Sequence, residues 1–136
     1  MDAGMMPIDP NVVRLTLHVL AATIWVGGQI VLIALMPTLR RTAPGAIVPV
    51  ARAYAWVAWP AFAVLIATGI WSLGVVGAAM SEETYRTTMM VKLTLVVLSG
   101  LGAALHTLAK RPVLKGVWGT VGLVGAMGAL LFGVSL

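Results

Sequence analysis

The chain has 136 residues, a formal net charge of +5 and no cysteine; 60% of its residues are hydrophobic and only 10% are charged. A soluble domain is closer to one-quarter charged and needs that charge to cover its surface, so the composition excludes a soluble enzyme, a nucleic-acid-binding module and a disordered tail. The absence of cysteine excludes disulfides, thiolate metal sites and iron–sulfur clusters. We therefore expect a small integral membrane protein surrounded by the lipid bilayer.

Four apolar stretches reach the length of about 20 residues that crosses a bilayer as a helix. They run from about residue 11 to 36, 54 to 76, 88 to 109 and 114 to 136. Because they fill most of the chain, residues 1–136 are predicted to form a single transmembrane domain, an all-α four-helix bundle. The alternating pattern of a membrane β-barrel is absent.

The first stretch begins at Asp9-Pro10-Asn11, where proline suits the first helical turn and an acidic or amide side chain can cap free N–H groups. Its polar residues are separated by four, seven and four positions, which places them on one stripe of the helix: Arg14, His18, Trp25 and Gln29. The apolar run ends near Pro37.

A short loop containing Pro44, Gly45 and Pro49 is predicted before the second stretch. Pro60 lies inside that stretch, where we expect a kink or a late helix start. Near its far end, the side chains of Thr68, Trp71 and Ser72 can form hydrogen bonds.

The third stretch carries Lys92, Ser99 and His106, spaced by seven and seven and therefore on one stripe, which we expect to face the polar stripe of the first stretch. Lys92 and His106 are roughly 20 Å apart along the axis. Lys92 and His18 both come early in their stretches, and His106 comes late. A single metal ion or haem bridging the two histidines is therefore disfavoured, and the predicted site combines His18 and Lys92 with Thr68 and Arg14.

Glycine recurs every third residue in the fourth stretch, at Gly116, Gly119, Gly122, Gly125 and Gly128. Small residues spaced in this way allow close approach of another helix, so this is a packing face or the interface of a homodimer or larger membrane complex.

Charge asymmetry predicts the orientation in the membrane. The loops after the first and third stretches hold six of the nine basic residues: Arg40, Arg41, Arg52, Lys110, Arg111 and Lys115. All four acids lie on the other side: Asp2, Asp9, Glu82 and Glu83. We expect a multi-pass protein of the cytoplasmic (inner) membrane with both termini outside and no role in nucleic-acid binding.

Several methionines fall on the predicted outer side: Met5, Met6, Met80, Met89 and Met90. Thioether sulfur and imidazole both bind copper, so His18, Met80, Met89 and Met90 are candidate copper ligands. The alternatives are ordinary packing for the methionines, a hydrogen-bonded core residue for His18, and an interfacial position for Lys92 and for His106. Trp25 walls a cofactor site or packs between helices, and the other tryptophans are interpreted as interfacial anchors.

The segment from Leu17 to Gly28, LHVLAATIWVGG, resembles the first helix of the CopD-type copper-resistance membrane domain. Thr68-Gly69 is similar to the end of that family's second helix, and Thr84-Tyr85 followed by Lys92 is similar to its entry to the next one, with Arg86 where glycine is usual. The resemblance covers most of the chain. It implies a role in copper homeostasis, with copper uptake or transfer as the activity and His18 and Lys92 as the matched polar positions.

The first helix also resembles that of the HemJ-type four-helix haem proteins, which implies haem b and porphyrin oxidation. This chain departs from that family where Pro37 comes twelve residues after Trp25 and is followed by Thr38. The departure argues against porphyrin oxidation and leaves haem binding open, with Arg14, Arg86 or Lys92 available for the propionates. Three hypotheses remain: a copper-handling protein, a b-type haem oxidoreductase or respiratory-complex subunit, and a structural or assembly subunit. Of enzyme and non-enzyme, we expect a non-enzyme.

Overall fold

The computed structural model describes residues 7–77 and 81–136, and every regular element in these ranges is helical. The order is α1 (Pro10–Ala22), a π-helical turn η1 (Thr23–Gly27), α2 (Gly28–Thr42), a 3₁₀ turn η2 (Pro44–Ala46), α3 (Ile47–Val75), α4 (Glu83–Leu108) and α5 (Pro112–Val134). Because α1, η1 and α2 run on continuously, they form one long helix.

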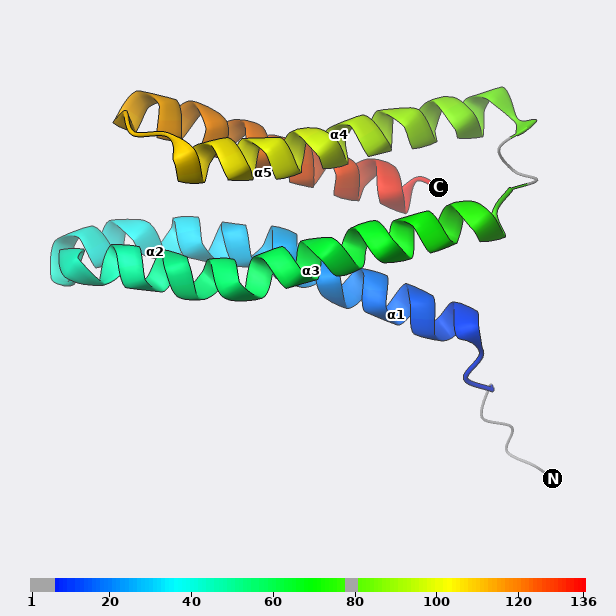
Figure 1. Cartoon of the computed structure of the whole chain (residues 1–136), viewed down its shortest axis with the longest axis horizontal. Coiled ribbons are helices and arrows are strands. Elements are labelled where there is room, and N and C mark those ends of the chain that lie inside the picture. Colours follow the sequence, from blue (N-terminus) through cyan, green and yellow to red (C-terminus); the bar gives the residue numbers. More distant parts are fainter. Residues whose placement is uncertain (1–6, 78–80) are drawn as a thin grey trace.

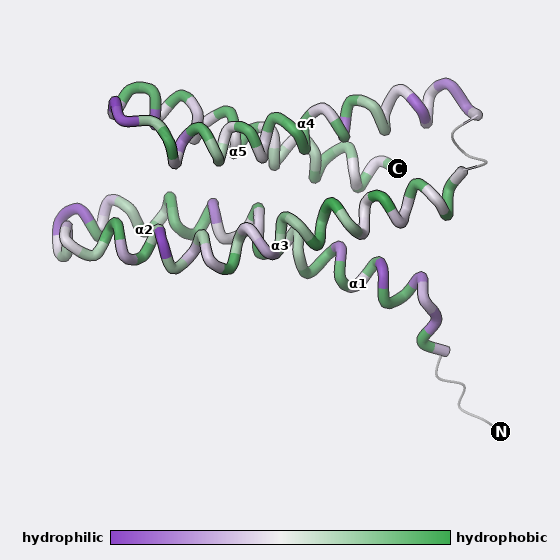
Figure 2. Tube along the Cα trace, viewed as in Figure 1, coloured by the Kyte–Doolittle hydropathy of each residue, from purple (hydrophilic) through white to green (hydrophobic). Residues whose placement is uncertain are grey.

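Four helices in the described residues are long and apolar enough to cross a membrane: Pro10–Thr42, Pro44–Val75, Glu83–Leu108 and Pro112–Val134. The prediction of an all-α protein with four such helices is confirmed. Figure 2 shows hydrophobic residues along all four, with hydrophilic ones gathered toward the helix ends. The chain is therefore a multi-pass membrane protein.

The helices lie side by side as two antiparallel hairpins, one formed by α1–α2 with α3 and the other by α4 with α5 (Figure 1). We call the end of the bundle where α1 begins the Pro10 end, and the opposite end, where α2 stops, the Thr42 end. The α1 start, the end of α3 and the start of α4 lie at the Pro10 end (Figure 1). Helix α4 passes into α5 at the Thr42 end.

Helix α1 begins where the Asp9-Pro10-Asn11 sequence predicted. Pro10 occupies the first helical position and the Asp9 carboxylate accepts a hydrogen bond from the Val12 backbone N–H at 2.8 Å. Helix α2 continues through Pro37 to Thr42, beyond the end of the apolar run. Helix α3 begins at Ile47, so Pro60 lies well inside it, and the alternative of a late helix start at Pro60 was wrong. Packed membrane helices tolerate such prolines because neighbouring groups satisfy the freed backbone.

Helices α4 and α5 approach closely because glycines face each other across their interface. A methyl group at Gly102 would meet the backbone of Gly122, and one at Gly125 would lie 2.8 Å from the Ser99 backbone nitrogen. The expected packing face of the fourth helix is therefore used within this chain. Gly119 lies against His106 in the same interface.

The buried core lies at the middle of the bundle, where η1 meets α3 and α5. It contains Trp25, Val26, Ala58 and Ala126. Small residues on two of these helices leave room for the large Trp25 indole, which is only 4% exposed. This core joins the two hairpins at mid-height.

Candidate functional site

A polar cluster connects α1 to α3 near the Pro10 end. The Arg14 guanidinium donates a hydrogen bond through Nη1 to Ser72 Oγ, and Ser72 in turn donates to the Thr68 carbonyl at 2.8 Å. Arg14 is buried, and among residues 7–77 and 81–136 its Nε has no hydrogen-bond partner. A buried guanidinium with an unused donor is costly unless another acceptor is supplied, so this site has capacity for an acidic ligand.

His18 lies one turn further along α1, and its Nδ1 is 2.7 Å from Thr68 Oγ1. The Thr68 hydroxyl directs its single hydrogen to the Val64 carbonyl, 2.7 Å away. Thr68 Oγ1 must therefore accept from His18, which places a proton on Nδ1 and leaves the lone pair of a neutral imidazole on Nε2. His18 is thus held in the form that metal-ligating histidines adopt.

Lys92 approaches this cluster from α4. Its side chain is half-buried and lies against Gly133 of α5, where a methyl group would come within 3.4 Å of Nζ. Arg14 and Lys92 are both near enough to His18 to interact with it electrostatically. The sequence places no acidic residue inside a span to balance these charges, because Glu83 stands at the very start of α4. The site is therefore locally cationic.

Of the predicted site residues, Arg14, His18 and Thr68 are brought together and Lys92 lies near them. Trp25 is two turns away from His18 along the helix. Among the candidate thioether ligands, Met89 is buried on α4 and Met90 is 50% exposed. Met80 lies outside the described residues, as do Met5 and Met6.

Trp25 crosses from one hairpin to the other, as the facing polar stripes predicted. Its indole Nε1 donates to Ser99 Oγ at 2.9 Å, and both residues are buried. The ring also packs against Phe62, with centroids 4.4 Å apart, and edge-on against Trp59 at 5.3 Å. Trp59, interpreted from sequence as an interfacial anchor, is part of this aromatic cluster instead.

The π-helical turn around Trp25 frees backbone carbonyls for side chains. The Trp25 carbonyl accepts from Gln29 Nε2 at 2.9 Å and from the Tyr54 hydroxyl at 2.9 Å. Such single π turns recur at functional sites because they interrupt the regular hydrogen-bond ladder. Nothing in the hydrophobic pattern predicted this turn, and Tyr54 was missed as a site residue.

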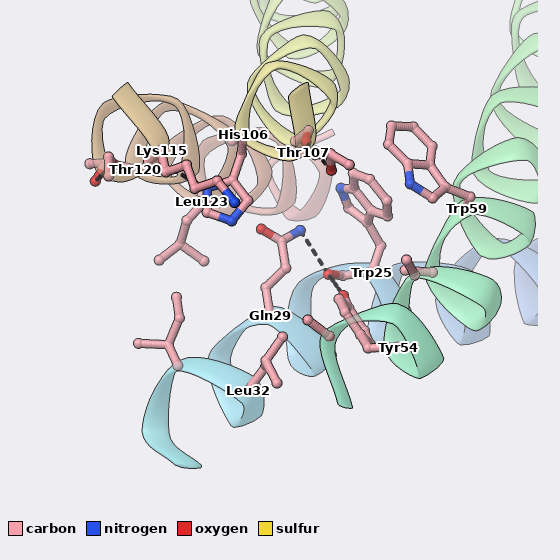
Figure 3. Close-up of a pocket in the computed structure, with 18 residues that line it drawn as sticks. Trp25, Gln29, Leu32, Tyr54, Trp59, His106, Thr107, Lys115, Thr120 and Leu123 are labelled. Atoms are coloured by element: carbon pink, nitrogen blue, oxygen red, sulfur yellow. Dashed lines mark hydrogen bonds between the residues drawn. The ribbon is translucent and has the colours of Figure 1, made fainter. Parts of the chain in front are cut away.

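On the Thr42 side of Trp25, a cavity of about 360 Å³ opens between the two hairpins (Figure 3). Mostly apolar residues line it, and its labelled polar side chains come from four helices: Gln29, Tyr54, His106, Thr107, Lys115 and Thr120. His106, which the sequence separated from His18, therefore belongs to a second region of the molecule. His106 Nδ1 is 2.6 Å from the Lys115 carbonyl.

The fold and the two polar regions thus define a multi-pass helical membrane protein with a cationic histidine site near one end and a separate cavity toward the other. No family model, no curated protein and no solved structure matches this chain.

Proposed function

We propose that the protein binds a b-type haem in the membrane, whose iron the Nε2 atom of His18 would hold. The observation that carries this proposal is the hydrogen bond from His18 to Thr68, since it fixes the tautomer and leaves one ring nitrogen free. A bound haem would supply a redox-active iron, in keeping with an oxidoreductase or a respiratory-complex subunit.

The charges around His18 support haem as the ligand. A haem carries two propionates. Suitable partners for such carboxylates are a nearby Lys92 and a buried Arg14, whose Nε has no partner in the part of the chain that the structure describes. Without an anionic ligand, these cations would have no opposite charge inside the bundle. Residues of this chain therefore fit both the metal and the periphery of a haem.

A copper-handling role is the second candidate, favoured by the buried thioether of Met89. Met89 precedes Lys92 by three residues, so both lie on the same face of α4. Imidazole and thioether together suit Cu(I), as the resemblance to the CopD-type domain implies. The two neighbouring cations oppose a bare metal ion, which is why we rank copper uptake or transfer below haem binding.

An assembly role through the fourth helix has less support, because Gly119, Gly122 and Gly125 already pack against α4. Homodimer formation would need another surface. We further propose the cytoplasmic membrane as the location, with both termini outside, from the distribution of basic residues.

The visible spectrum of the purified protein tests the proposal. After expression with haem supplementation, the wild type is expected to show a Soret band and reduced-minus-oxidised α and β bands. His18→Ala should lose most of this absorbance, and His106→Ala, which changes the other histidine, should keep it.

The same samples are analysed for copper after loading with Cu(I). A wild type with no Soret band overturns the haem proposal. If the wild type then binds copper, and His18→Ala and Met89→Leu do not, the second candidate is established. If the wild type binds neither haem nor copper, only the assembly role is left.

A further inference from the structure

The cavity between the two hairpins lies apart from the proposed haem site and changes in character along its length. At the middle of the bundle its wall is made of buried residues: Trp25, Ala58 and Gly122. Toward the Thr42 end the wall reaches the exposed side chains of Thr107 and Lys115 (Figure 3). Because the exposed face of a membrane-spanning bundle meets lipid, a molecule of the bilayer can enter the cavity from this side.

Most of the cavity wall is apolar. Its aliphatic side chains include Leu32, Ile33, Ala51, Ala55 and Leu123. The volume of about 360 Å³ is at the lower end of the range for small-molecule sites, about 300–1,000 Å³. This space suits part of one hydrocarbon chain rather than a whole lipid, and burial of such a chain favours binding.

Lys115 brings a positive charge to this apolar wall. The backbone carbonyl of Lys115 lies 2.6 Å from His106 Nδ1, and an imidazole can donate this bond in its neutral or its charged form. Gly119 makes the contact possible, because a methyl group there would lie 2.9 Å from the same nitrogen. The start of α5 is thereby held against α4, with Lys115 in the cavity wall.

The Thr42 end around the cavity is strongly basic. Besides Lys115 it carries further exposed bases: Arg40 and Arg41 in the last turn of α2, Arg52 in α3, and Lys110 and Arg111 between α4 and α5. The acidic residues that the structure describes are all at the opposite end, where Asp9 caps α1 and Glu82 and Glu83 stand at the start of α4. The 26 residues of α4 separate the two groups, so within residues 7–77 and 81–136 no acidic side chain pairs with these bases.

Net charge, and not the direction of hydrogen bonding, selects the ligand of this cavity. The neutral polar groups of the wall include both donors and acceptors, such as the Trp59 indole N–H and the Gln29 amide. An uncharged hydrocarbon would leave Lys115 without a partner, and a water-soluble anion would not use the apolar wall. A molecule with an anionic head and a hydrocarbon chain fits both.

We propose that the cavity binds one acyl chain of an anionic phospholipid from the membrane leaflet at the Thr42 end, with the lipid headgroup paired to Lys115. Basic pockets between membrane helices bind anionic headgroups in this way. The other bases attract the same class of lipid to this end of the bundle, and the cavity holds the chain of one molecule. The site does not depend on haem at His18.

Two phospholipids with identical chains test the preference: dioleoyl phosphatidylglycerol, which has a net negative charge, and dioleoyl phosphatidylcholine, which has none. Native mass spectrometry of the full-length protein in detergent measures the dissociation constant of the first lipid bound. Phosphatidylglycerol is expected to bind at least about fivefold more tightly, the effect of one basic side chain on an anionic lipid. Glycerophosphoglycerol, the same headgroup without chains, should not displace it.

Lys115→Gln tests the charge at the cavity. It should lower the affinity for phosphatidylglycerol about fivefold, close to that for phosphatidylcholine. Lys110→Gln is the matched control, because Lys110 is exposed at the same end and does not line the cavity. Its effect should be less than about twofold, since solvent and salt screen a charge that lies away from the bound headgroup.

Ala55→Phe tests the place of the chain. A phenyl ring at this position would occupy space in the cavity, so both phospholipids should bind at least about fivefold more weakly. Ala53→Phe is the matched control, because it adds the same ring to an exposed position of α3 outside the cavity, and it should leave both affinities unchanged. Circular dichroism confirms that each variant is folded.

Equal affinity of the wild type for the two phospholipids would overturn the inference. So would equal losses in Lys115→Gln and Lys110→Gln, which would indicate general attraction to a basic surface, or an unchanged affinity in folded Ala55→Phe. Displacement by glycerophosphoglycerol would also overturn it, because the site would then bind a soluble phosphate. None of these measurements requires haem, so their failure is distinct from failure of the His18 proposal.

Discussion

At the scale of single residues, Thr68 determines what His18 can do. Its hydroxyl donates to the Val64 carbonyl and accepts from the imidazole, so the two bonds together specify one ring tautomer. Ser72 does the same for Arg14, accepting from the guanidinium and donating to the Thr68 carbonyl. Two ordinary hydroxyl residues on α3 thereby orient both basic side chains of α1.

Replacement of Thr68 by valine tests this orientation. Thr68→Val keeps the shape of the side chain and removes the acceptor, so His18 can reorient or change tautomer. If haem is bound as proposed, affinity should fall about 10- to 100-fold, as for other partners of metal-bound histidines. Haem titration followed at the Soret band measures this loss.

Thr68→Ser is the matched control because it restores the hydroxyl, and it should recover most of the affinity. An unchanged haem titration in folded Thr68→Val would show that the bond to His18 does not contribute to ligand binding.

At the scale of elements, the contact between α4 and α5 depends on the absence of side chains. Gly102 and Gly125 are buried, and a methyl group on either would press on backbone atoms that cannot rotate away. Between membrane helices there is little hydrophobic drive for association, so close packing contributes much of the stability. The glycines of α5 are therefore structural here.

Gly125→Ala should accordingly destabilise the protein by about 1–3 kcal/mol, because its Cβ would lie 2.8 Å from Ser99 N and 2.9 Å from the Leu95 carbonyl. Gly74→Ala in α3 is the control. No atom of the described residues lies within 4 Å of a methyl group there, so the change should be neutral or stabilising by up to about 1 kcal/mol.

Thermal unfolding in detergent, followed by circular dichroism, compares the two variants with the wild type. Equal stability of Gly125→Ala and Gly74→Ala would mean that α4 and α5 separate readily and that their interface carries little of the free energy of unfolding.

At the scale of the whole molecule, the α1 start and the α5 end lie toward the same end of the bundle, the Pro10 end (Figure 1). The Thr42 end carries most of the basic loop residues, and the rule that such residues stay inside predicts that the Pro10 end is outside. The His18 site would then lie in the outer half of the membrane and the cavity nearer its inner surface.

Single cysteines test this orientation on a background that has none. Glu82→Cys lies beside the α4 start and Gly45→Cys lies in η2; both positions are exposed. In intact cells, a membrane-impermeant maleimide should label Glu82→Cys and should label Gly45→Cys only after permeabilisation. The reverse pattern would invert the topology.

The facing stripes of the first and third spans were largely predictable. Seven-residue spacing placed Trp25 and Ser99 on interior faces, and the two residues are joined by a hydrogen bond. Thr68 of α3 was grouped with Arg14 and His18 from the sequence. The spacing did not predict which α3 residue each of them bonds to, because the position of a residue on one helix does not identify its partner on a neighbouring helix. The sequence also left open whether a helix starts or continues at Pro60. Helix α3 continues through it, since packing overrides the local effect of proline.

The sequence by itself determined the class of molecule: too little charge for a soluble surface, four apolar stretches of membrane length, and few polar residues within them. Those properties are sums over many residues, so the local sequence pattern is enough to predict the class of protein. Only the tertiary structure decided which histidine nitrogen is free, which carbonyls the π turn releases, and that His106, Gln29 and Trp25 share one cavity. These features depend on hydrogen bonds and packing between residues that are distant in sequence. The sequence of a single helix does not specify such contacts.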